Sequence, residues 1–153
     1  MTKSINGFNG KYRWLSNFYP SQIEFEGIVY PTVEHAYQAA KSTSHSFRQQ
    51  IALCTTPGEA KAMGRTAVLR SDWDDVKVVI MQTLLRKKFY DPGLSNLLFM
   101  TGEAILEETN YWHDQFWGNC VCKKHRDTPG ENWLGKSLMK VREMQDASSS
   151  TSD

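Results

Sequence analysis

The chain of 153 residues carries 18 lysines and arginines against 17 aspartates and glutamates, so its formal net charge at pH 7 is +1. This balance excludes a histone-like polycation and an acidic tail protein, and any contact with nucleic acid has to use a local patch. Three cysteines do not form a disulfide framework. Together with the lack of an apolar leader and of any stretch near ~18 apolar residues, they predict a cytoplasmic protein with reduced thiols and no membrane partner.

The first half of the chain shows signals for a hairpin and two helices. Ile23 and Phe25 alternate with acidic residues, Glu26-Gly27 can form a turn, and residues 28–30 are β-prone, which together predict a short β-hairpin. Thr32 is a candidate N-cap for a helix over residues 33–51. A capping box at residues 56–59, with proline at the first helical position, predicts a short helix that ends near Gly64.

The second half is predicted to hold three more helices and one strand. One helix follows the Ser-Asp cap at residues 71–72 and runs through Phe89, and a second begins at Asp91-Pro92. Residues 104–108 are a plausible strand. Residues 109–131 show no periodicity, and a loop of that length in a small domain is often functional. A last helix is expected to begin near Asn132.

These elements predict an α+β fold that is mostly helical, with a few short strands, in a single compact domain over residues 1–146. The remaining residues, 147–153, are Ser-rich, and their composition predicts a disordered tail. The aromatic share of 12% suits either a site that stacks on flat rings or a core rich in tryptophan.

The first candidate site lies on the helix that follows Thr32. Glu34, Tyr37, Gln38 and Lys41 have the spacing that places side chains on one helical face. A carboxylate and a lysine on one face form either a solvated ion pair or an acid–base pair in a cleft. Glu34 also suits the first turn of a helix because of the helix dipole.

Three further segments combine charge with aromatic rings or glycine. Asp114 stands three residues before Trp117 in the long loop, either as part of a site or as a turn former beside an aromatic plug. Lys61 and Arg65 flank a helix end, where they either hold a phosphate or complement the dipole. Trp73 at a helix start either packs in the core or stacks on a base.

Metal and cofactor chemistry receive little support from the sequence. Cys120, Cys122 and His125 have the spacing C-x-C-x2-H, with His113 nearby, but a second distant pair of ligands is missing, so we predict no metal site. The chain contains no dinucleotide-binding glycine motif, no P-loop and no nucleophile elbow, and we expect no cofactor.

Seven segments, in their order along the chain, form a specific set. They are residues 15–20, 31–41, 61–65, 72–73, 85–89, 114–118 and 132–142. This set resembles the NADAR family, named for NAD and ADP-ribose and also called YbiA-like or riboflavin-intermediate N-glycosidases, over roughly residues 8–144. The chain departs from the family's glycine-rich run at residues 119–130, where the basic stretch 123–126 either touches phosphate or is a solvated loop.

The resemblance implies a small, mainly helical α+β enzyme that cleaves the bond between ribose C1 and an amine nitrogen. We expect in the first place an enzyme that removes ADP-ribose from guanine bases in nucleic acid. An N-glycosidase for phosphoribosylamino-pyrimidine intermediates of riboflavin synthesis and a non-catalytic ADP-ribose-binding module are the alternatives. The implied partners are an ADP-ribose or phosphoribosyl-type small molecule and ADP-ribosylated DNA.

The resemblance also implies roles for individual residues. Glu34 matches the family's acidic residue, and burial in a dry pocket is expected to raise its pKa so that it exchanges a proton with the leaving nitrogen. Asp114 would orient the sugar hydroxyls or activate water, and Lys41 offers a second route through a Schiff base. The expected substrate-binding residues are Ser16, Asn17, Tyr37, Lys61, Arg65, Trp73, Trp117 and Asn132.

Overall fold

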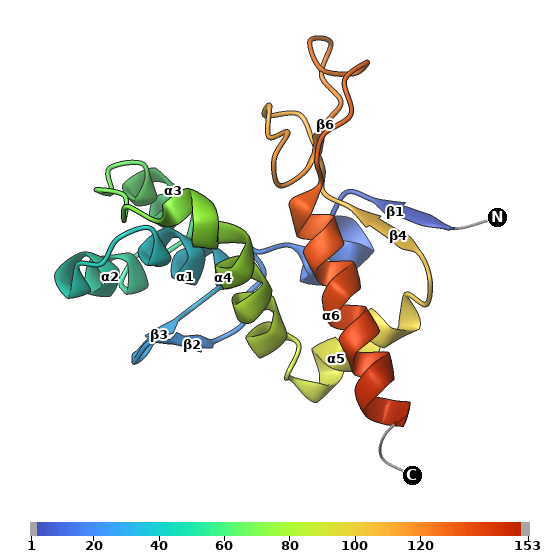
Figure 1. Cartoon of the computed structure of the whole chain (residues 1–153), viewed down its shortest axis with the longest axis horizontal. Coiled ribbons are helices and arrows are strands. Elements are labelled where there is room, and N and C mark those ends of the chain that lie inside the picture. Colours follow the sequence, from blue (N-terminus) through green and yellow to red (C-terminus); the bar gives the residue numbers. More distant parts are fainter. Residues whose placement is uncertain (1–2, 151–153) are drawn as a thin grey trace. The chain divides into compact units, whose positions relative to one another are not determined.

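The computed structural model describes residues 3–150, except for the side chains of residues 148–150. The chain divides into two units (Figure 1). The central unit is Ser16–Tyr90, and the terminal unit joins residues 3–15 to residues 91–150. Within the described residues, six α-helices and several strands of two or three residues confirm the predicted α+β class with mostly helical structure.

The central unit begins with the predicted hairpin. Strand β2 (Ile23–Phe25) pairs antiparallel with β3 (Ile28–Tyr30), with Ile23 opposite Tyr30. Glu26 and Gly27 both have positive φ, at 49° and 87°, as a tight two-residue hairpin turn requires. Ile23, Phe25 and Tyr30 are buried and Ile28 is half-buried, whereas Glu24 and Val29 are exposed, so one face of the hairpin is directed inward.

The prediction of a single helix over residues 33–51 is wrong, because the structure has two helices there. Helix α1 (Val33–Ala40) ends before a short turn, and α2 (His45–Ala52) begins after Ser44. The hydroxyl of Ser42 accepts a hydrogen bond from the Ser44 amide at 3.0 Å, and the Ser44 hydroxyl accepts one from the Phe47 amide at 3.2 Å. These serines satisfy backbone donors outside a helix, and they therefore favour a break.

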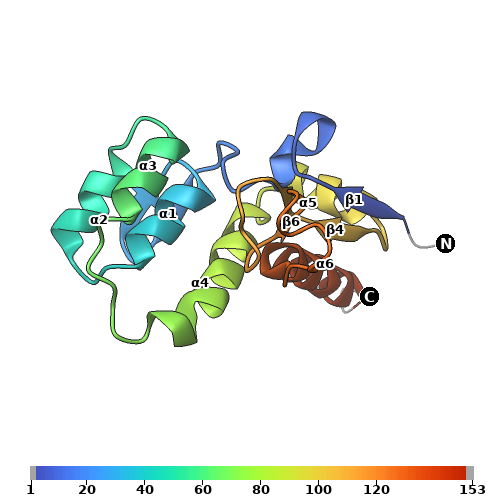
Figure 2. The same cartoon turned by 90° about the horizontal axis from the view of Figure 1, so that it is seen from above.

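The other two helices of the central unit agree with the sequence. Helix α3 (Pro57–Gly64) has the predicted cap, with the Thr56 hydroxyl accepting from the Glu59 amide at 3.1 Å. Helix α4 (Trp73–Lys88) begins and ends within two residues of the prediction. Helix α1 packs against α2, α3 and α4 and is buried along its whole length, so it is the core of this unit (Figure 2).

The terminal unit contains a strand pair that the sequence did not predict. Strand β1 (Ser4–Asn6) runs parallel to β4 (Ile105–Glu107), which matches the predicted strand at residues 104–108. A 3-10 helix, η1 (Gly10–Leu15), follows β1. Helix α5 (Pro92–Met100) begins at the predicted Asp91 cap, whose carboxylate accepts from the Leu94 amide at 3.0 Å.

Helix α6 (Trp133–Ser150) packs on β4 and begins where the sequence predicted a last helix. The structure places residues 147–150 of the expected tail in this helix, and residues 151–153 lie outside the described residues. Within residues 3–150, no helix is both long enough and apolar enough to cross a membrane.

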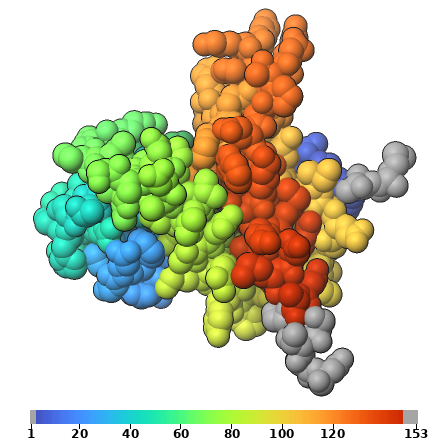
Figure 3. Space-filling model, viewed as in Figure 1, coloured from blue at the N-terminus to red at the C-terminus, as the bar shows by residue number. Residues whose placement is uncertain are grey.

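The segment between β4 and α6 is largely irregular, as its lack of periodicity predicted. Two strands of two residues, β5 (Thr109–Asn110) and β6 (Asn119–Cys120), pair in parallel, with Asn110 opposite Cys120. Residues 111–131 form a lobe beyond the first turn of α6 (Figure 3). We call this segment the loop lobe.

Candidate active site

Helix α1 places a carboxylate and an amide inside the central unit. Glu34 is 8% exposed and Gln38 is 3% exposed, and Gln38 Nε2 donates to Glu34 Oε1 at 2.7 Å. The backbone amide of Glu34 donates to the carbonyl of Asn17 at 3.1 Å, which fixes the start of α1 against the preceding loop. A buried, hydrogen-bonded carboxylate excludes the interpretation of this face as a solvated ion pair.

Aromatic rings connect this carboxylate-bearing helix to the start of α4. The rings of Tyr37 and Trp73 lie 5.2 Å apart between centroids with an interplanar angle of 52°, and both residues are buried. Lys41 is half-buried, and its Nζ lies 5.5 Å from the centroid of the Tyr37 ring. The structure thus brings together three of the predicted site residues on one side of Glu34's helix.

Three charged groups of the central unit act on Lys41. Burial lowers the pKa of Lys41 below its usual value, and Glu34 opposes this shift. The positive charges of Lys61 and Arg65 add to the lowering of the Lys41 pKa. Lys61 lies in the last turn of α3 and Arg65 caps its C-terminus, so the end of α3 supplies two cations to the surroundings of Lys41.

The loop before the hairpin is held by a lysine that the sequence analysis gave no role. Lys88 is 1% exposed, and its Nζ donates to the Ser16 carbonyl at 2.8 Å. Burial lowers the pKa of Lys88 to about 7. Nothing in the run of lysines at the end of α4 distinguishes Lys88 from the exposed Lys87. The one signal is its spacing, since Lys88 lies four residues after the buried Leu84 and therefore on the same face of α4.

The two predicted binding residues in this loop are placed differently. The Ser16 hydroxyl accepts from the Phe18 amide at 3.1 Å and so stabilises a local turn. Asn17 is buried, with its Nδ2 3.5 Å from the sulfur of Met81. Its Oδ1 is buried and has no hydrogen-bond partner among the described residues. A buried acceptor without a partner is costly in a folded protein, so this oxygen is a candidate for contact with a ligand.

In the terminal unit, the Asp114 carboxylate stabilises a turn. Its Oδ1 accepts from the amides of Phe116 at 3.1 Å and Trp117 at 2.8 Å. A Cβ added to Gly118 would lie 2.2 Å from the carbonyl oxygen of Glu108, so the position requires glycine. The motif D-x-x-W-G therefore has a structural role in the loop lobe, and a catalytic role for Asp114 stays a prediction.

Asn132 joins the loop lobe to β4. Its Oδ1 accepts from the Glu108 amide at 3.0 Å, and its Nδ2 donates to the Leu106 carbonyl at 2.9 Å. It also has a positive φ of 53°, a conformation that asparagine tolerates better than most residues. These contacts give Asn132 a clear structural role, and its predicted contact with substrate is untested.

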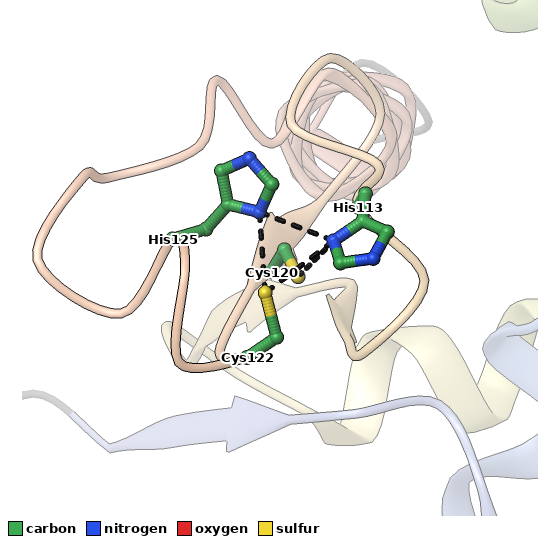
Figure 4. Close-up of side chains that lie close together, drawn as sticks. All are labelled: His113, Cys120, Cys122 and His125. Atoms are coloured by element: carbon green, nitrogen blue, oxygen red, sulfur yellow. Dashed lines mark hydrogen bonds between the residues drawn. The ribbon is translucent and has the colours of Figure 1, made fainter.

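The loop lobe also gathers two cysteines and two histidines. Atoms of His113, Cys120, Cys122 and His125 that are able to ligate a metal lie within 4.8 Å of one another (Figure 4). All four residues are visible in the sequence, but the lack of a second distant ligand pair there predicts no metal site. The pairing of β5 with β6 brings His113 back to the cysteines, and sequence spacing alone does not show this.

Comparisons with known proteins agree with the resemblance seen in the sequence. A family model described as the NADAR domain matches residues 6–145. An N-glycosidase of Nostoc punctiforme is 42% identical over 138 residues, which cover 86% of this chain and 85% of that protein. The N-glycosidase YbiA of Escherichia coli is 36% identical over 135 residues, which cover 86% of this chain and 81% of YbiA.

A solved structure and a longer relative extend this comparison. The NMR structure of the E. coli protein YbiA superposes with a TM-score of 0.84 at 32% sequence identity, covering 100% of this chain and 91% of YbiA. A chloroplastic riboflavin biosynthesis protein of Zea mays, PYRR, is 34% identical over 146 residues, which cover 84% of this chain and 22% of that protein.

Proposed function

We propose a substrate and catalytic residues for this chain on the premise that it belongs to the NADAR family and is a hydrolase acting on N-glycosyl bonds. The proposed substrate is ADP-ribose joined through ribose C1 to an amine nitrogen of guanine in nucleic acid. The observation that carries this choice is the set of charges that act on Lys41, namely the cations Lys61 and Arg65 and the buried carboxylate Glu34.

The cations suit a substrate with more than one phosphate. A diphosphate carries about two negative charges at neutral pH, and arginine and lysine bind phosphate oxygens through charge-assisted hydrogen bonds. Lys61 and Arg65 come from the end of α3, and Lys41 follows the end of α1, so two separate elements contribute. Such an arrangement can hold both phosphates of ADP-ribose.

We assign proton transfer at the leaving nitrogen to Glu34. Cleavage of the C1–N bond builds positive charge on C1 and the ring oxygen, and the departing amine requires a proton. A positioned carboxyl group suits this task, since it can act as a general acid or base toward the leaving nitrogen. Gln38, which donates to Glu34 Oε1 at 2.7 Å, fixes the orientation of the carboxyl group.

Lys41 offers a covalent route. Its lowered pKa increases the fraction of neutral amine, which is the nucleophilic form. In this route the amine attacks C1 of the ring-opened ribose, the C1–N bond to the base breaks, and the base leaves with a proton. Water then hydrolyses the resulting imine and restores the lysine. In the direct route, water attacks C1 without a covalent intermediate.

The remaining residues are proposed to bind the substrate. Trp73, in contact with Tyr37, presents an aromatic surface on which a base or ribose can stack. The unpartnered Oδ1 of Asn17 can accept a hydrogen bond from a ribose hydroxyl. The roles of Asp114 in orienting sugar hydroxyls or water, and of Trp117 in stacking, are proposed from the family motif.

A second substrate class is favoured by the names of two relatives. The proteins from Zea mays and Vibrio vulnificus that match this chain are both riboflavin biosynthesis proteins. The same groups could act on a phosphoribosylamino-pyrimidine, whose single phosphate would need fewer of the three cations. A non-catalytic module that binds ADP-ribose is the alternative from another class.

The test compares both substrates in parallel. The protein is incubated with ADP-ribosylated guanine in a short oligonucleotide and, separately, with a phosphoribosylaminopyrimidine, and products are identified by mass spectrometry. Many turnovers on the oligonucleotide support the proposal. Cleavage of the pyrimidine alone would assign the second substrate class, and ADP-ribose binding without any product would assign the binding module.

Two variants test the residue assignments. Glu34→Gln is expected to lower kcat by several orders of magnitude, whereas Glu143→Gln, which changes an exposed carboxylate on α6, should retain wild-type turnover. Borohydride added during turnover should trap an adduct on Lys41 if the covalent route operates, and Lys41→Arg should show none. A Glu34→Gln protein with near-native turnover would overturn the assignment of Glu34.

A further inference from the structure

The loop lobe contains four side chains whose metal-binding atoms converge on one point. His113 Nδ1 lies 3.3 Å from His125 Nδ1 and 3.4 Å from Cys122 Sγ. Cys122 Sγ lies 3.2 Å from His125 Nδ1, and Cys120 Sγ lies 4.0 Å from His113 Nδ1. Figure 4 shows that both imidazole rings turn the same nitrogen, Nδ1, toward the two sulfur atoms. We call these four residues the Cys2His2 cluster.

These separations are those of donor atoms around a tetrahedral zinc ion. With Zn–S near 2.3 Å and Zn–N near 2.0–2.1 Å, tetrahedral geometry places two nitrogens about 3.3 Å apart, nitrogen and sulfur about 3.6 Å apart and two sulfurs about 3.8 Å apart. The observed N–N distance is 3.3 Å, three of the four N–S distances are 3.2, 3.4 and 4.0 Å, and all four ligand atoms lie within 4.8 Å of one another. No large movement of the chain is needed for all four atoms to reach one ion.

Hydrogen bonding explains the cluster poorly. A thiol is a weak donor and a weak acceptor, and a neutral imidazole has only one N–H group to share. Two Nδ1 atoms that face each other and two sulfurs can therefore form only a few weak hydrogen bonds. A divalent ion that accepts one lone pair from each atom satisfies all four at once.

The fold of the loop lobe builds the cluster from local contacts. The parallel pairing of β5 with β6 places Asn110 beside Cys120. Asn110 Nδ2 donates to the Asp114 carbonyl at 2.8 Å, and Asn110 Oδ1 accepts from the Asp114 amide at 3.1 Å, so the chain turns back at His113. A turn in which the His125 amide donates to the Cys122 carbonyl at 3.1 Å supplies the other two ligands.

We propose that the Cys2His2 cluster binds one Zn²⁺ in a closed, structural site. Four protein ligands fill a tetrahedral shell and leave no position for water or substrate, which distinguishes structural from catalytic zinc. Two thiolates balance the two charges of the ion, so the site adds no net charge beside the basic residues Lys123, Lys124 and Arg126. The ion would fix the loop lobe, including the turn that Asp114 stabilises.

Metal content provides the first test. Reduced protein is loaded with Zn²⁺, freed of unbound ion by desalting, and analysed by mass spectrometry for zinc per chain. We expect one zinc per wild-type chain and a loss of at least tenfold in retained zinc for Cys122→Ser and His125→Gln. Cys54→Ser and His45→Gln, which change the same residue types in the central unit, should retain one zinc per chain.

Cobalt substitution keeps the proposal testable even if a ligand variant fails to fold. Wild-type protein loaded with Co²⁺ should show a thiolate-to-cobalt charge-transfer band and the intense visible bands of tetrahedral cobalt. Lys123 and Lys124 lie between two ligands, so zinc should also slow tryptic cleavage there, and a chelator should restore it. Wild-type protein that retains no zinc and shows no thiolate–cobalt band would overturn the proposal, as would equal zinc loss in the Cys54→Ser control.

Discussion

The packing of Gly64 against Gln38 allows a test of how Glu34 is held in place. A Cβ added at Gly64 would lie 1.9 Å from Gln38 Oε1, 2.7 Å from its Cδ and 3.0 Å from its Cβ. Gln38 is 3% exposed, so its amide has little space to retreat. Gly64→Ala should therefore displace this amide and break its 2.7 Å hydrogen bond to Glu34.

The expected loss of stability follows from two opposing contributions. A hydrogen bond to a charged group contributes about 1.5–3 kcal/mol. Alanine in place of glycine inside a helix stabilises the folded chain by up to about 1 kcal/mol. Gly64 is the last residue of α3, so the stabilisation is smaller there. We expect Gly64→Ala to lower the free energy of unfolding by about 1–2 kcal/mol and to reduce kcat because the Glu34 carboxyl loses its support.

A double-mutant cycle in urea, followed by tryptophan fluorescence, isolates the contact. In a Gln38→Ala background the two closest atoms are gone, so Gly64→Ala should become neutral or stabilising by up to about 1 kcal/mol. The two changes should therefore couple by about 2 kcal/mol. An equal cost of Gly64→Ala in both backgrounds would refute the reasoning, since the steric conflict would then lie elsewhere.

Two further predictions concern stability. The pKa of Lys88 is about 7 in the folded chain, so the folded chain loses this proton between pH 7 and pH 9, whereas the unfolded chain keeps it. The free energy of unfolding of the wild type should therefore rise over this range by about 2 kcal/mol more than that of Lys88→Met. Lys87→Met should keep the wild-type pH dependence, and equal slopes for wild type and Lys88→Met in urea unfolding would contradict the burial argument. Asn132→Ala should lower the free energy of unfolding by about 2–3 kcal/mol, because two hydrogen bonds are lost and alanine is strained in the left-handed conformation of this residue. Asn132→Gly removes the same hydrogen bonds but adopts this conformation without strain, so it should lower the free energy of unfolding measurably less in the same assay.

Local signals in the sequence predicted the elements whose stability is local. The Thr56 and Asp91 caps and the Glu26-Gly27 turn act within a few residues, and each is confirmed at its position. The break between α1 and α2 goes against the alanine-rich helix propensity of this stretch, because the hydroxyls of Ser42 and Ser44 compete for backbone amides there. Strand β1 was missed because its partner lies far along the chain.

The candidate site was predictable only where it lies on one helix. The spacing of Glu34, Tyr37 and Lys41 indicated a shared face, but burial decides between an ion pair and an acid–base group, and burial depends on the packing of α1 against three other helices. The Cys2His2 cluster depends on the pairing of β5 with β6. Two-residue strands leave no periodic pattern, so this convergence could not be seen in the sequence.

The parallel pairing of β1 with β4 has a consequence for the order in which the chain assembles. Ser4 lies opposite Ile105, and the whole central unit lies between these two residues in the sequence. Closing a flexible loop of roughly 100 residues costs about 4 kcal/mol in chain entropy, which three residue pairs do not repay early in folding. The contacts of α1 to α4 and of the loop lobe span far shorter stretches of sequence and can form first. Once the central unit has folded, it no longer has to be ordered as a flexible loop when β1 meets β4, so we expect these two strands to pair last.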